Sequence, residues 1–87
     1  MALTLRDRWI THFVVRDGAL VLRHDAGKVL LPVKEISSHK HISYAQVVIR
    51  LFSGRRYDLS LLCFRSKEID ELMKFLRAVE RENRVRT

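Results

Sequence analysis

The sequence is poor in the residues that crosslink, break or loop a chain. Its 87 residues include one cysteine, one proline and three glycines. A single cysteine excludes an internal disulfide framework and favours a reducing, cytoplasmic setting. Three dispersed glycines exclude a glycine-rich phosphate-binding loop. No apolar run approaches the roughly 20 residues that a membrane-spanning helix needs, and the early charged residues argue against a signal peptide.

Acidic residues are also scarce, with 10 Asp and Glu against 17 Lys and Arg and a formal net charge of +7. The excess is spread along the chain. Residues 1–30 carry five basic and three acidic side chains, residues 31–60 five and two, and residues 61–87 seven and five. Without a basic arm or run, this balance favours solubility over a dedicated nucleic-acid footprint. A hydrophobic fraction of 47% and this length indicate one folded domain over residues 1–87.

The clearest periodicity lies near the C-terminus. Apolar residues recur there at steps of three and four, which predicts an amphipathic helix, and they are Ile69, Leu72, Met73, Leu76 and Val79. Ser66 is placed to cap the start of this helix. Glu80 and Arg84 have the spacing of an ion pair along the helix surface. A helix of this kind buries its stripe against a sheet.

The rest of the chain alternates in steps of two, as strands do. Strands are expected over residues 10–15, 19–24 and 28–33, then over 44–52 and 56–64. Asp17-Gly18 is a strong hairpin signal, and Gly54 supplies a second turn. Because Pro32 has no N–H to donate, the third strand should end or bend there or lie at the edge of a sheet. Residues 34–43 are polar and are expected to form an irregular strand or loop. The predicted fold class is α+β: a curled antiparallel sheet of five to six strands closed by one C-terminal helix.

The candidates for chemistry give no enzyme signature. His39 and His41 form an H-x-H pair that could bind a metal from a strand, but no third ligand is near in sequence. Cys63 continues the alternation of the last strand and is expected to be a buried structural thiol. We expect no catalytic residue, no metal and no cofactor.

Two surfaces are candidates for binding. The first is an apolar patch that would mark a protein interface or self-association; the alternative is that a curled sheet buries these residues internally. Its members are Trp9, Val48, Phe52, Leu62, Phe64 and Phe75. The second is a basic surface for the phosphates of nucleic acid, the alternative being a solvated face. Its members are Lys34, Lys40, Arg55, Arg56, Lys74, Arg77, Arg81 and Arg84.

Three segments carry a family resemblance: residues 17–23 (DGALVLR), 29–37 (VLLPVKEIS) and 47–59 (VVIRLFSGRRYDL). Together they resemble the small bacterial pleckstrin-homology-like domains over about residues 13–82. The resemblance implies a partial barrel closed by the C-terminal helix, and a function in binding without catalysis. Because the first hairpin turn lacks the spread of basic residues that phosphoinositide binders use, a protein partner is favoured over a lipid. The predicted function is therefore a small protein-binding module that self-associates, with nucleic-acid binding as the alternative.

Overall fold

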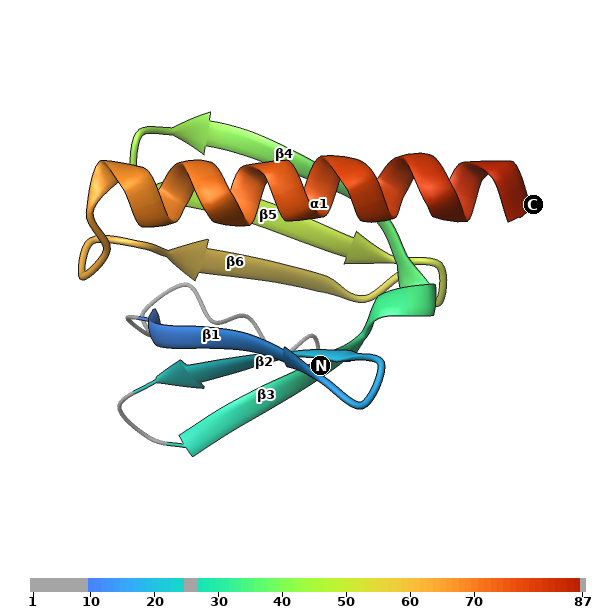
Figure 1. The fold of residues 1–87 in the computed structure, drawn as a ribbon, viewed down its shortest axis with the longest axis horizontal. Coiled ribbons are helices and arrows are strands. Elements are labelled where there is room, and N and C mark those ends of the chain that lie inside the picture. The colour runs from blue at the N-terminus through green and yellow to red at the C-terminus, as the bar shows by residue number, and fades with distance from the viewer. Residues whose placement is uncertain (1–9, 25–26, 87) are drawn as a thin grey trace.

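The structure, a computed structural model, describes residues 10–24 and 27–86. It has two three-stranded antiparallel sheets and one C-terminal helix (Figure 1), which confirms the α+β class. The first sheet contains β1 (Ile10–Arg16), β2 (Ala19–His24) and β3 (Gly27–Pro32). The second contains β4 (Ile36–Ser43), β5 (Gln46–Leu51) and β6 (Arg56–Ser60). Between the sheets lies the short 3-10 helix η1 (Val33–Glu35), and α1 (Ser66–Arg86) follows β6.

The prediction of a single curled sheet is wrong, because the six described strands form two separate sheets and close no barrel. The break falls where β3 ends at Pro32 and the chain turns through η1. Proline has no backbone N–H to donate, so the strand ladder cannot continue past it in the usual way. The expectation that Pro32 ends the third strand is confirmed.

The first hairpin forms as the sequence predicts. Asp17 has a φ of 53° and Gly18 a φ of 74°, so both central residues of the turn have positive φ. A turn of this kind matches the right-handed twist of the strands it joins, and Asp-Gly adopts it readily. β1 and β2 pair across it, with Arg16 opposite Ala19.

Strand β4 is longer and more regular than the sequence indicated. Residues 34–43 were expected to be irregular, but Ile36–Ser43 form an eight-residue strand with a register shift near each end. His39 lies opposite Ile49, and Lys40 lies opposite Val48. Pairing with the apolar strand β5 therefore fixes the conformation of a polar segment that has little strand pattern of its own.

The core lies between the two sheets and α1. The predicted helical stripe is confirmed, since Ile69, Leu72, Met73, Leu76 and Val79 are all buried. Helix α1 packs along β4 and η1 (Figure 1). The remaining core comes from both sheets and the loop before the helix, namely Ile10, Leu20, Leu22, Leu31, Ile36, Val47, Ile49, Leu51, Tyr57, Leu59, Leu61 and Phe64.

Two details of the segment before α1 differ from expectation. The Arg65 carbonyl accepts a hydrogen bond from the Ile69 N–H, and the Arg65 N–H donates to the Glu68 carboxylate, so Arg65 is the capping residue. The Ser66 hydroxyl instead contacts the Tyr44 hydroxyl. Cys63 is exposed rather than buried. Cys63 does not continue the alternation of buried and exposed residues in β6, because β6 ends at Ser60 and the chain turns after Leu61.

One buried polar side chain joins the end of α1 to the junction between the sheets. Asn83 is only 4% exposed. Its Nδ2 atom donates to the carbonyls of Val33 and Ile36, each at 2.8 Å. These carbonyls flank the point where the chain leaves the first sheet for the second, so Asn83 fixes the helix against that junction.

Candidate functional site

Of the six residues expected to form an apolar interface, the five that the structure describes do not form one patch. Phe52 and Leu62 are exposed, at 53% and 64% of their surface. Phe52 lies in the turn before β6 and Leu62 in the loop after it, so the two lie beyond opposite ends of that strand (Figure 1). They do not share one continuous surface.

The other described members of this set, Val48, Phe64 and Phe75, are buried or partly buried. Phe64 belongs to the core and makes an edge-to-face contact with Phe13, with ring centroids 5.5 Å apart. Phe75 is partly buried against the core, and Val48 is 6% exposed. Trp9 lies outside the described residues. The expected apolar patch is thus divided between core and separate exposed sites.

The eight residues of the alternative, basic surface fall into three locations. Lys34 is in η1 and Arg55 is in the turn between β5 and β6. Lys40 and Arg56 lie on β4 and β6 of the second sheet. The remaining four are on α1, namely Lys74, Arg77, Arg81 and Arg84. The structure brings Lys40 and Arg56 together around one hollow.

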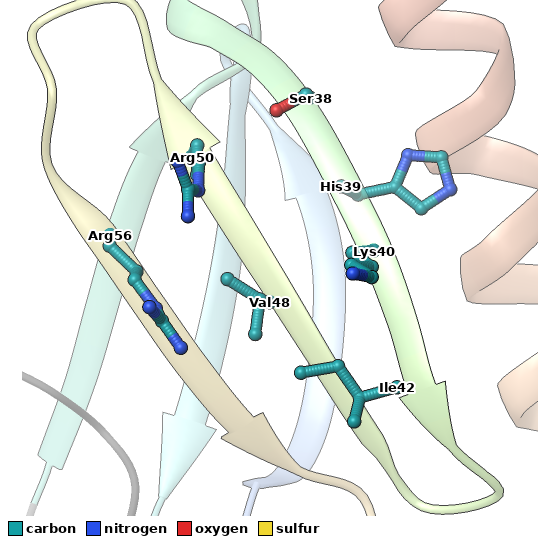
Figure 2. Close-up of a pocket in the computed structure, with 7 residues that line it drawn as sticks. All are labelled: Ser38, His39, Lys40, Ile42, Val48, Arg50 and Arg56. Carbon is teal, nitrogen blue, oxygen red and sulfur yellow. The ribbon is translucent and has the colours of Figure 1, made fainter.

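That hollow lies on the outer face of the second sheet and is called here the basic groove. Figure 2 shows Lys40, Arg50 and Arg56 arranged around Val48, whereas His39 points to the opposite side, toward α1. Its volume is about 450 Å³, and Ser38 and Ile42 complete the lining. Sequence reasoning missed Arg50, although its even spacing from Val48 along β5 places both on one face.

The groove has more positive than negative charge. Arg50 lies directly opposite Arg56 in the strand register, and Ser38 lies opposite Arg50 on the other side. The Arg56 Nε atom is 2.9 Å from the Asp58 carboxylate. Within residues 10–24 and 27–86, neither Lys40 nor Arg50 forms an ion pair with a carboxylate. Three cations against one carboxylate leave two positive charges at this surface.

The groove continues toward an end where Ile42 is exposed. A second hollow of about 220 Å³ lies there, and it is lined by Ile42, Gln46, Val47, Val48, Arg56, Asp58 and Leu59. Ile42 is 53% exposed, and Gln46 adds an amide that can both donate and accept. The long side chains of this face leave Val48 largely covered. The outer face of the second sheet therefore has a cationic end beside an aliphatic end.

The two histidines of the H-x-H pair have separate partners. The His39 Nδ1 atom is 2.7 Å from the Glu80 carboxylate of α1, an ion pair when the imidazole is protonated, although the ring N–H is not aligned with that oxygen. Glu80 also contacts Arg84, which confirms the expected pair along the helix. His41 Nε2 is 3.2 Å from the Tyr44 carbonyl. In the described part of the chain, no group of three metal-binding side chains occurs.

The outer face of the first sheet carries a feature that the sequence analysis did not single out, called here the apolar row. Val14, Val21 and Leu30 lie directly opposite one another on β1, β2 and β3. Val14 is 52% and Leu30 55% exposed. The alternation of β2 contained the signal, because Val21 is out of phase with the buried Leu20 and Leu22.

The apolar row lies in a hollow of about 480 Å³ with a basic edge. The charged residues that line it are Arg16, Asp17, Arg23 and Lys28, three of them positive. Helix α1 packs on β4, in the other sheet. In the described part of the chain, the inner face of the first sheet contributes Leu20, Leu22 and Leu31 to the core, whereas the outer face leaves Val14 and Leu30 about half exposed.

No protein-family model, curated protein or solved structure matches this chain. In the part that the structure describes, no helix has the length and hydropathy of a membrane span. The resemblance to pleckstrin-homology-like domains stays a prediction.

Proposed function

We propose that this protein is a non-enzymatic binding module that docks another protein on the outer face of its first sheet. The apolar row is the observation that carries the proposal. Val14, Val21 and Leu30 occupy one cross-strand line, and the outer two are about half exposed. Burying the exposed half of such a side chain contributes on the order of 1 kcal/mol. A contiguous exposed patch with a polar edge is typical of a protein interface.

The charge around the row indicates the chemistry of the partner. Arg16, Arg23 and Lys28 surround it, with Asp17 as the one acidic residue lining the same hollow. A partner with an apolar centre and acidic residues at its edge matches this surface and would be attracted to it. A second copy placed face to face would bring the basic edges together. The occupant we propose is therefore a different protein with an acidic rim.

The other supports are indirect. The family resemblance implies a domain that acts by binding, and it favours a protein over a lipid. The self-association expected from the sequence remains a separate prediction. It does not require the apolar row.

The test compares two double variants that each remove exposed apolar groups. Val14→Thr with Leu30→Thr alters the apolar row, and threonine suits strand positions. Phe52→Thr with Leu62→Thr alters apolar groups of similar exposure elsewhere. A partner isolated on the immobilised wild-type protein is identified by mass spectrometry, purified, and titrated against all three proteins by calorimetry.

The row variant should bind at least tenfold more weakly than wild type, and the control within about threefold, which is under 1 kcal/mol. Affinity for the wild type should fall as salt rises, because the partner's rim is acidic. Thermal melts of each variant establish that it is folded. Equal losses in both variants, a loss confined to the control, or the absence of any saturable protein partner would overturn the proposal.

A further inference from the structure

We infer that the basic groove on the second sheet binds a nucleotide, with the phosphate at Arg50, Arg56 and Lys40 and the base at the aliphatic end. This site is on a different sheet from the apolar row and does not depend on the proposed protein partner. The inference rests on the arrangement of charges in the strand register, on the exposed aliphatic side chain of Ile42 beside them, and on the size of the groove.

The charge arrangement adds a local repulsion that a bound anion would relieve. Arg50 and Arg56 are direct cross-strand neighbours on one face, and like charges in that position destabilise a sheet. Lys40 is two residues along β4 from Ser38, which lies opposite Arg50, and it adds a third cation to the same hollow. The contact with Asp58 neutralises only one of the three. An oxyanion between these groups would relieve their repulsion.

The functional groups suit phosphate in particular. Guanidinium groups form paired hydrogen bonds with phosphate oxygens, and lysine contributes a mobile point charge. Ser38 lies opposite Arg50 and contributes a hydroxyl that can donate. Figure 2 shows Arg50 and Arg56 extending over the same face of neighbouring strands. Two guanidinium groups, an ammonium and a hydroxyl are thus available to one phosphate.

The exposed side chain beside the cationic end indicates what carries the phosphate. Ile42, 53% exposed, provides aliphatic surface there, with Gln46 and the Arg56–Asp58 pair around the same hollow. A flat base can rest on this surface while an amide contacts its edge. The volume of about 450 Å³ is far larger than one phosphate needs and is within the range of ligand pockets. The unit could come from a free mononucleotide or from a single-stranded nucleic acid.

The experiment uses fluorescence anisotropy with a labelled single-stranded oligonucleotide, and competition by AMP, inorganic phosphate and a phosphoserine peptide. Arg50→Gln is compared with Arg23→Gln on the first sheet and Arg77→Gln on α1. Each variant removes one positive charge. The three variants therefore have equal net charge and differ only in where the charge was removed. Ile42→Ala tests the aliphatic end.

Arg50→Gln should weaken oligonucleotide binding at least tenfold, while Arg23→Gln and Arg77→Gln change it by less than threefold. The slope of log affinity against log salt should decrease in magnitude by about one in Arg50→Gln, as expected for the loss of one phosphate contact. It should stay unchanged in the other two arginine variants. Ile42→Ala should weaken AMP but leave inorganic phosphate unchanged. Thermal stability of Arg50→Gln should equal or exceed that of wild type, which rules out unfolding as the cause of the loss.

Each remaining outcome decides the source of the nucleotide or overturns the site. AMP competing as well as the oligonucleotide identifies a free nucleotide, and an oligonucleotide that binds at least tenfold more tightly identifies a strand. Equal losses in all three arginine variants would mean attraction by net charge alone. Stronger competition by the phosphoserine peptide than by AMP, or no binding by any probe, would also overturn the inference.

Discussion

Asn83 shows how much one residue contributes to the arrangement of the whole chain. It sits in the last turns of α1, among exposed charged residues, yet it is buried and donates to two carbonyls in the segment that joins the sheets. A buried amide that bonds to backbone groups of a distant segment fixes their relative position, because leaving those groups unpaired costs free energy. The helical period places Asn83 on the buried side, four residues after Val79, but its polar side chain does not continue the apolar stripe.

Asn83→Ala should therefore destabilise the protein by about 1–3 kcal/mol, because it removes two hydrogen bonds at a buried site. Urea denaturation followed by circular dichroism measures this. Arg81→Ala, an exposed position on the same helix, is the control and should stay within about 0.5 kcal/mol of wild type. An Asn83→Ala protein as stable as the control would mean that these hydrogen bonds contribute nothing.

At the level of elements, α1 and β4 form in different ways. The helix has its own apolar stripe, so its sequence predicts both its conformation and the side it buries. Strand β4 has polar residues at most positions and is held by pairing with β5 and by α1 lying along it. The contact between the His39 imidazole and the Glu80 carboxylate, at 2.7 Å, joins these two elements at a partly buried position. A polar strand of this kind depends on its neighbours.

Leu72→Ala tests the docking of α1. Leu72 is fully buried in the middle of the stripe, so the truncation should cost on the order of 2–5 kcal/mol through lost apolar contact and the cavity left behind. Chemical denaturation gives the value, with Arg77→Ala on the exposed side of the same helix as the matched control. Unfolding at the same denaturant concentration as wild type would contradict the packing of this helix on the core.

At the level of the whole molecule, the two outer sheet faces are distinct. The first has an apolar row with a basic edge, and the second has a cationic groove with an aliphatic end. The net charge of +7 is general, but its effect at each face depends on which side chains the strand register brings together. The two proposed ligand sites lie on different sheets and share no lining residue.

The salt dependence of association distinguishes two partners at the apolar row: a second copy of this chain and a different protein with an acidic rim. The sequence predicts self-association, and any dimer that covers the apolar row of both copies would bring like charges together. Such a dimer should strengthen as salt screens that repulsion. Sedimentation velocity at low and high salt, with the Val14→Thr and Leu30→Thr double variant as control, measures this. A dimer that weakens with salt, or that persists in the double variant, would be formed through another surface.

The sequence by itself determined the features that depend on near neighbours. The Asp17-Gly18 turn, the end of β3 at Pro32 and the stripe of α1 follow from backbone preferences and from a period of 3.6 residues. These signals act over a few residues, so no knowledge of the remaining chain is needed. The α+β class follows from their order.

Tertiary structure decided the rest: the division into two sheets, the strand formed by residues 36–43, the exposure of Cys63 and the meeting of Arg50 with Arg56. The two candidate surfaces belong to this group. A side chain's neighbours across a sheet depend on strand register, and a shift of one residue moves every side chain to the other face. That register is set by the packing of the complete core, which no short segment of sequence contains.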